Sequence, residues 1–218
     1  MFPYIADCGT NKALRMDEEH NRGEPGRSVR RGERRPRPLD ARLLDELALA
    51  YVARFASSGG RLAAYLKRKI RERGWADETT SDVAALVERM VARGFVDDAG
   101  YAMARGAGLM RRGFGARRIA ETLARDGIAA PLVAEASGTD HARRQAALAF
   151  ARRRRLGPFG AGSAAARNLR KDRLDPATRA RQVAAMLRAG HPLATACALI
   201  DAVDDVAAQQ WVDEADDA

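Results

Sequence analysis

The chain has few aromatic residues, few cysteines and no long apolar run, and each shortage excludes a class of protein. Phe, Trp and Tyr make up 6% of the 218 residues, and β-branched runs are absent, so the composition favours helices over sheets. Two cysteines at opposite ends do not build a disulfide framework, which suits a reducing compartment. No stretch of about 18 apolar residues could span a membrane, and the first ten residues lack a secretory pattern. We therefore expect a soluble, cytoplasmic protein.

Residue groupings typical of catalysis or metal binding are also lacking. The three histidines are scattered, and no spacing of His, Cys, Asp or Glu imitates a zinc site. The adjacent carboxylates of Asp97 and Asp98 are better explained by helix capping than by acid–base chemistry. Residues 113–115 read Gly-Phe-Gly, but no strand precedes them and no Gly-Lys-Ser/Thr follows, so they do not form a nucleotide loop. The sequence predicts no enzyme, no metal and no cofactor.

Positive charge is in excess, and it is unevenly distributed. The net charge is +9 and the computed pI is near 10.3, which points to polyanions or acidic protein surfaces as partners. Residues 139–190 hold 13 basic and 3 acidic side chains, whereas residues 191–218 hold seven acidic side chains and no Lys or Arg. The acidic segment could contact a partner or shield the basic block, and the sequence leaves both readings open.

Residues 1–38 predict a flexible, disordered arm. They contain four prolines and a run of arginines between residues 27 and 37, and few apolar side chains that could offset the entropy of ordering. The arm could be a solvated tail or a nonspecific nucleic-acid tether.

Apolar side chains recur at helical spacing from Asp40 onward. The first such face consists of Leu43, Leu44, Leu47, Tyr51, Val52 and Phe55. Comparable middle helices end at three glycines, Gly74, Gly127 and Gly190, each four residues beyond an apolar anchor. We predict an all-α fold in which three diverged three-helix repeats follow one another and form an elongated, curved body. The predicted boundaries are 39–96, 97–138 and 139–203 for the repeats and 204–218 for an acidic C-terminal tail.

The second predicted repeat carries a composite motif of about 35 residues. It consists of Gly94-Phe95-Val96-Asp97-Asp98, Tyr101-Ala102, Arg111-Arg112-Gly113-Phe114-Gly115, Arg117-Arg118-Ile119, Leu123 and Gly127-Ile128. This pattern resembles the central repeat of the RecX family, and weaker similarity extends over residues 40–203. The chain departs from the family pattern at Gly100, where a basic residue is common, and at His191-Pro192, where an aromatic residue and Ser or Thr are common.

The resemblance implies a negative regulator of the RecA recombinase, active in homologous recombination, DNA repair and the SOS response. Such a protein lies in the groove of the RecA filament on single-stranded DNA and lowers its ATPase, strand-exchange and co-protease activities. We expect a monomer with possible direct DNA contact and no membrane association. One alternative is an independent nucleic-acid-binding protein with helix-turn-helix-like modules, although the second helices offer few side chains that read base edges. Another is an adaptor that binds a different filamentous or acidic partner.

Three clusters of basic residues are the candidate partner or DNA contacts. They are Lys67, Arg68, Lys69 and Arg71; Arg111, Arg112, Arg117 and Arg118; and Arg152, Arg153, Arg154 and Arg155. Arginine binds phosphates and carboxylates alike, and Gly113 and Gly115 precede a helix whose N-terminus would favour an anion. Each cluster could instead be a solvated turn or helix end. We expect Trp75, Phe95 and Phe114 in core or hinge packing rather than in stacking on bases.

Overall fold

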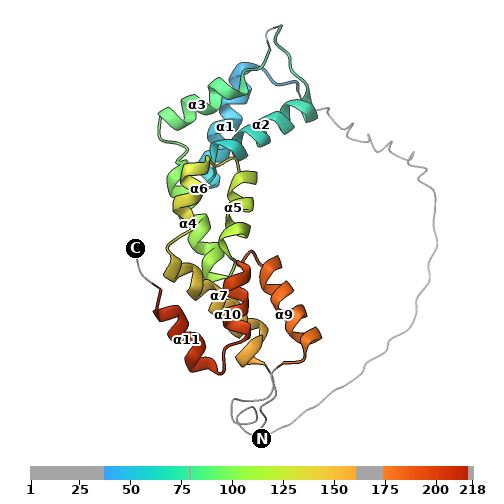
Figure 1. Ribbon diagram of the computed structural model, residues 1–218. Coiled ribbons are helices and arrows are strands. Elements are labelled where there is room, and N and C mark those ends of the chain that lie inside the picture. The colour runs from blue at the N-terminus through green and yellow to red at the C-terminus, as the bar shows by residue number, and fades with distance from the viewer. Residues whose placement is uncertain (1–36, 79, 161–173, 216–218) are drawn as a thin grey trace, which may run out of the picture. The chain divides into compact units, whose positions relative to one another are not determined.

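The computed structural model describes residues 37–78, 80–160 and 174–215, and these residues are helical, as the sequence predicts. They form ten α-helices and one 3-10 helix (Figure 1), namely α1 (Ala41–Arg54), α2 (Gly59–Arg73), α3 (Val83–Ala92), α4 (Asp98–Arg111), α5 (Ala116–Arg125), α6 (Ala130–Ala136), α7 (Asp140–Arg154), η1 (Gly157–Phe159), α9 (Pro176–Arg188), α10 (Leu193–Ile200) and α11 (Asp205–Asp213). The predicted arm, apart from its last two residues, lies outside the described ranges.

Helices α1, α2 and α3 enclose the first of three hydrophobic cores. Its fully buried side chains include Leu62, Leu66, Leu86 and Met90. Leu39, just before α1, is also fully buried in this core, and its N–H donates to the Gly74 carbonyl at the end of α2 at 2.9 Å. The prediction that Phe55 shares the buried face of the first helix is wrong. Helix α1 ends at Arg54, and the Phe55 side chain is 54% exposed.

Helices α4, α5 and α6 enclose the second core, which is built around the fully buried Ile119 and Leu123 of α5. Helices α4 and α6 pack closely because Gly106 faces the backbone of Ala136, where a Cβ atom on residue 106 would not fit. The Asp97 carboxylate caps α4 by accepting from Gly100 N–H at 2.9 Å, which confirms the predicted capping role of this residue.

The third core lies among α7, α9, α10 and α11 and includes Phe150, Met186 and Leu199. Helix α11 lies within the segment that the sequence analysis set apart as an acidic tail. Its Ala208 and Val212 are completely buried in the third core, and Asp204 caps its first turn. Apolar residues at a spacing of four thus dock this helix, while its acidic residues face outward.

The middle helices of the three bundles, α2, α5 and α9, meet end to end. The Gly115 N–H, at the start of α5, donates to the Ala189 carbonyl at the end of α9 at 2.9 Å. At the other junction, the Ser58 hydroxyl at the start of α2 donates to the Asp126 carbonyl at the end of α5. In Figure 1 these three helices lie along one side of the bundles.

Glycine makes this end-to-end contact possible. A Cβ atom on Gly60 would lie 2.6 Å from the Gly127 Cα atom, and one on Gly115 would overlap the Gly190 carbonyl group. Gly127 and Gly190 also have left-handed backbone angles, with φ of 80° and 95°. Two of the three glycines that the sequence marks as helix ends, Gly127 and Gly190, are therefore points at which one bundle contacts the next, whereas Gly74 ends α2 within the first bundle.

We predict that Gly60→Ala lowers the free energy of unfolding by about 1–3 kcal/mol, because the added methyl group overlaps a rigid backbone. Alanine is otherwise the better helix former. The matched control is Gly108→Ala in α4, where the new Cβ would meet only the Arg111 side chain, at 3.8 Å. This control should stabilise the protein by about 0.5–1 kcal/mol. Urea unfolding of both variants tests the contact, and equal stabilisation by the two substitutions would contradict it.

Candidate functional site

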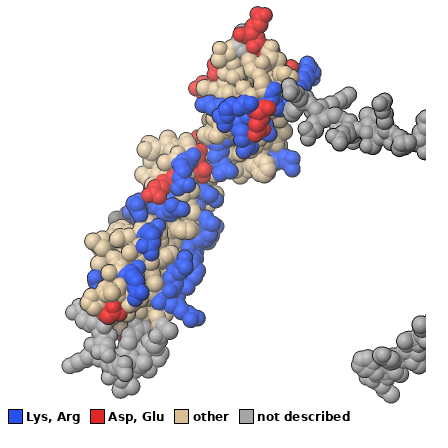
Figure 2. All heavy atoms as spheres, turned by 90° about the vertical axis from the view of Figure 1, so that its right-hand side faces the viewer, with Lys and Arg blue, Asp and Glu red and all other residues tan. Residues whose placement is uncertain are grey.

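Lys and Arg side chains gather along the face of the protein on which α2, α5 and α9 lie (Figure 2). We call the exposed basic residues of these three helices the basic face. They are Arg61, Lys67, Arg68 and Arg71 on α2, Arg117, Arg118 and Arg125 on α5, and Arg181 and Arg188 on α9. Because the three helices are joined end to end, successive bundles contribute positive charge to the same face.

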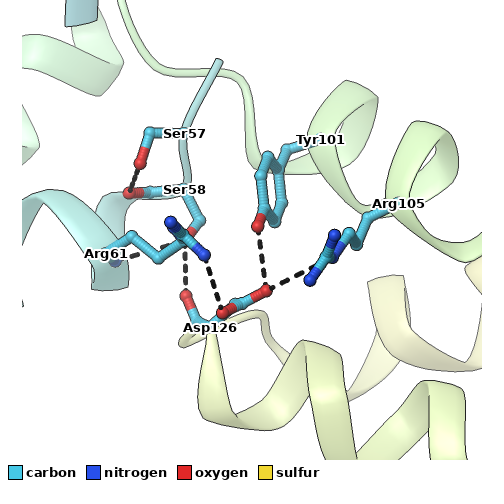
Figure 3. Close-up of polar contacts among 6 residues, drawn as sticks. All are labelled: Ser57, Ser58, Arg61, Tyr101, Arg105 and Asp126. Carbon is cyan, nitrogen blue, oxygen red and sulfur yellow. Dashed lines mark hydrogen bonds and ion pairs between the residues drawn. The ribbon is translucent and has the colours of Figure 1, made fainter. Parts of the chain in front are cut away.

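The junction between the first two bundles is organised by the Asp126 carboxylate (Figure 3). It accepts a hydrogen bond from the Tyr101 hydroxyl at 2.8 Å and forms ion pairs with Arg61 at 3.4 Å and Arg105 at 3.9 Å. The Asp126 side chain is only 14% exposed. Burial, together with the hydrogen bond to this carboxylate, raises the pKa of Tyr101. One carboxylate therefore links side chains of α2 and α4 to the end of α5.

The junction between the second and third bundles contains the buried imidazole of His191. This side chain is 4% exposed, and its Nε2 donates to the Gly113 carbonyl at 3.1 Å. The ring also lies against Phe150, with 5.7 Å between the centroids. Burial lowers the pKa of His191, since the charged form would lose its hydration, and the hydrogen bond to Gly113 opposes this effect.

The first predicted cluster lies along α2. Lys67, Arg68 and Arg71 are exposed and Lys69 is half-buried. Glu72 neutralises part of this charge, with Lys69 Nζ at 2.6 Å and Arg68 Nε at 3.5 Å from its carboxylate. The hydrogen bond from Lys69 lowers the pKa of Glu72. Lys67 and Arg71 line a cavity between α2 and α3.

The second predicted cluster is split by the structure. Arg111 is the last residue of α4 and Arg112 follows it, whereas Arg117 and Arg118 lie in the first turn of α5. The Arg117 guanidinium donates to the Leu187 carbonyl of α9 at 2.6 Å, so this side chain helps to hold two bundles together. Arg118 faces Glu121 at 3.7 Å.

The third predicted cluster ends α7. Arg152, Arg153 and Arg154 form its last turn, and Arg155 follows with a left-handed φ of 53°, which confirms that the quartet reaches the end of the helix. Arg153 donates to the Arg112 carbonyl, so the second and third clusters meet at this point. Arg152 contacts Gln209 of α11 at 3.0 Å. All four side chains are exposed.

At the N-terminus of α5, the Gly115 and Arg117 N–H groups already donate to the carbonyls of Ala189 and Gly190, so fewer N–H groups are left for an anion than the sequence suggests. Phe95 is 50% exposed in the turn between α3 and α4 and belongs to neither neighbouring core, so it does not have the expected core packing. Trp75 and Phe114 do pack against the first and second cores, as predicted.

Reasoning from the sequence missed Arg61, Arg125, Arg181 and Arg188, which the structure places on the basic face. They are not contiguous in the sequence, so a search for runs of basic residues passes over them. The feature that they share in the sequence is their position on the middle helix of a repeat. Comparison of the repeats with one another could have found them.

Binding of a metal or insertion into a membrane has no support in the described part of the chain. Across residues 37–78, 80–160 and 174–215, no three His, Cys, Asp or Glu side chains are grouped so that they could hold a metal ion. None of the helices in these ranges combines the length and the apolar character that crossing a membrane requires.

The fold and this face define a helical-repeat protein with basic side chains on successive repeats. No family model matches the sequence. The regulatory protein RecX of Myxococcus xanthus (strain DK1622) is 33% identical over 201 residues, which cover 85% of this chain and 98% of the relative. The crystal structure of RecX from Lactobacillus salivarius has the same fold, with a TM-score of 0.53 at 13% identity over 79% of this chain and 96% of that one. The chain belongs to the RecX family.

The Asp126 carboxylate should contribute measurably to stability. We expect Asp126→Ala to lower the free energy of unfolding by about 1–3 kcal/mol, because it leaves the Tyr101 hydroxyl without this acceptor in a partly buried site. Asp126→Asn should recover part of the loss, since an amide oxygen can still accept from Tyr101. Glu88→Gln, on the exposed surface of α3, is the control and should change stability little. If Asp126→Ala unfolds at the wild-type urea concentration, the junction does not depend on this carboxylate.

The His191 imidazole should make stability fall as the solution becomes acidic. Because the folded-state pKa is lowered, the unfolded chain binds more protons than the folded one below about pH 6.5. The contribution of His191 to the free energy of unfolding is therefore fully present above that pH. It is lost as the pH falls toward the lowered pKa, by no more than about 1.4 kcal/mol per pH unit for one proton. Urea unfolding at pH 7.5 and 5.5 measures this slope. It should shrink in His191→Gln and persist in His141→Gln, and equal slopes in the two variants would contradict the assignment.

Proposed function

We propose that this protein is a negative regulator of the RecA recombinase. It binds in the groove of the RecA filament on single-stranded DNA and inhibits ATP hydrolysis, strand exchange and co-protease activity. Membership of the RecX family supports this function. The observation on which the proposal depends most is the basic face, because a repeating polymer is best matched by charges placed on successive, rigidly joined repeats.

The electrostatics favour a polyanionic or acidic partner. Arginine forks bind both phosphate and carboxylate oxygens in pairs, and a filament on DNA can present both. Of the residues on the face, Arg61 and Arg117 already take part in junctions between bundles, so the other members of the face are the better candidates for direct contact. Lys67, Arg68, Arg71 and Arg118 belong both to this set and to the predicted basic clusters.

The test is the ATPase rate of RecA on single-stranded DNA while the protein is titrated in. We expect inhibition at concentrations far below that of RecA, since a protein that blocks filament growth or promotes disassembly acts on many subunits. Inhibition only when the protein saturates the DNA would instead indicate an independent nucleic-acid-binding protein that competes for DNA.

Charge reversal on the basic face should weaken this inhibition. The double variant Arg118→Glu/Arg125→Glu should need at least about tenfold more protein for half-inhibition, because it replaces attraction by repulsion on α5. The control Arg42→Glu/Arg93→Glu changes the net charge equally at exposed positions on α1 and directly after α3. Circular dichroism checks that both variants remain helical. Equal loss of inhibition in the two variants would show that only total charge matters.

A further inference from the structure

An open cavity of about 700 Å³ lies between α1 and α2, and rings and guanidinium groups line it together. The aromatic residues are Tyr51, Phe55 and Tyr65, and the basic residues are Arg54, Arg61 and Arg68. Among the described residues that form its wall, none is Asp or Glu. This combination differs from the hydrophobic core beside it, which is built mainly from Leu, Val and Met.

The three rings form a connected series. Tyr51 and Tyr65 are stacked, with centroids 4.4 Å apart and planes at 20°, and Tyr51 and Phe55 are tilted, with centroids 5.4 Å apart. Phe55 ends the series and is 54% exposed. The first core does not account for this exposure, because Phe55 lies beyond the end of α1, outside the set of side chains that form that core.

Cations surround the rings. The Arg54 guanidinium lies 5.9 Å from the centroid of Phe55, and the Arg68 guanidinium lies 5.7 Å from that of Tyr65. Arg61 is held at the cavity by its ion pair with Asp126, and Arg68 by its contact with Glu72 at 3.5 Å. Positive groups are therefore positioned beside an exposed aromatic face.

We propose that this cavity is a binding site for single-stranded nucleic acid, in which a nucleobase stacks on Phe55 and the neighbouring phosphates contact Arg54 and Arg68. Stacking requires a base whose face is accessible, which a single strand provides and a duplex does not. An acidic peptide could satisfy the arginines, but it would leave the aromatic face unused. The site should tolerate any base, since every base has a flat face for stacking.

The cavity shares Arg61 and Arg68 with the basic face. Base stacking on Phe55 is nevertheless not required by the proposed action on RecA, and it can be measured with DNA alone. The experiment is fluorescence anisotropy of the full chain with two labelled 15-mers, one of thymidine residues and one with the same phosphates but abasic sugars. We expect the wild type to bind the thymidine strand about tenfold more tightly, as the loss of one stacked base predicts. Equal affinity for both strands, or binding to neither, would overturn the proposal.

The variant Phe55→Leu should remove the preference for the thymidine strand and leave affinity for the abasic strand unchanged, because the arginines remain. The side chain is already half exposed, so folding should be unaffected, and circular dichroism checks this. Phe95→Leu, at another exposed phenylalanine, is the matched control and should keep the preference. If Phe55→Leu and Phe95→Leu behave alike, or if an acidic peptide displaces the thymidine strand as well as unlabelled DNA does, base stacking at this site is wrong.

Inhibition of RecA by Phe55→Leu is measured in parallel. A loss of base preference with full inhibition would place the stacking site outside the regulatory contact and still support the proposal about DNA. A preference that survives in the variant would overturn the stacking site, whatever the effect on RecA.

Discussion

Direct contact between helix backbones at two pairs of glycines fixes how the bundles are joined. Gly60 meets Gly127, and Gly115 meets Gly190, at separations that leave no room for a Cβ atom. At the second pair, carbonyls at the end of α9 accept from N–H groups at the start of α5. These carbonyl and N–H groups lie at helix ends, where each would otherwise need water or a capping side chain as its hydrogen-bond partner. The basic face follows from this arrangement, because it places equivalent helices on one side (Figure 1).

The two junctions share this backbone contact but differ in their side-chain chemistry. At the first, the Asp126 carboxylate holds two partly exposed arginines and the Tyr101 hydroxyl. At the second, His191 is buried and its neutral form donates to a backbone carbonyl. Dissolved salt screens exposed ion pairs more strongly than a buried neutral hydrogen bond. High salt should thus affect mainly the first junction, and acid mainly the second.

Local pattern was enough to predict most of the helices and the glycines that follow three of them, because apolar spacing and left-handed glycines act over a few residues. It did not reveal α11, whose few apolar residues are recognisable only by what they pack against. The predicted helix ends at Gly74, Gly127 and Gly190 have the expected positive φ angles. The local pattern could not predict which distant part of the chain each helix end contacts. Arg117 and the Leu187 carbonyl are 70 residues apart. Nothing near Arg117 in the sequence therefore indicates that its side chain stabilises a junction and is not simply available to bind a ligand.

Several arginines of this chain therefore make contacts within the protein that are present before a partner binds. Arg61, Arg117 and Arg153 each bind a group on another bundle, and an arginine committed in this way has fewer donors left for a phosphate. The number of basic residues consequently overstates the number of side chains whose donors are free for a phosphate. Arg61 is also neutralised by Asp126, whereas Arg117 and Arg153 keep their charge beside neutral carbonyls. On single strands each neutralised phosphate contributes roughly −0.7 to the slope of log affinity against log salt. The measured slope should then reflect the uncommitted arginines of the basic face rather than the net charge of +9.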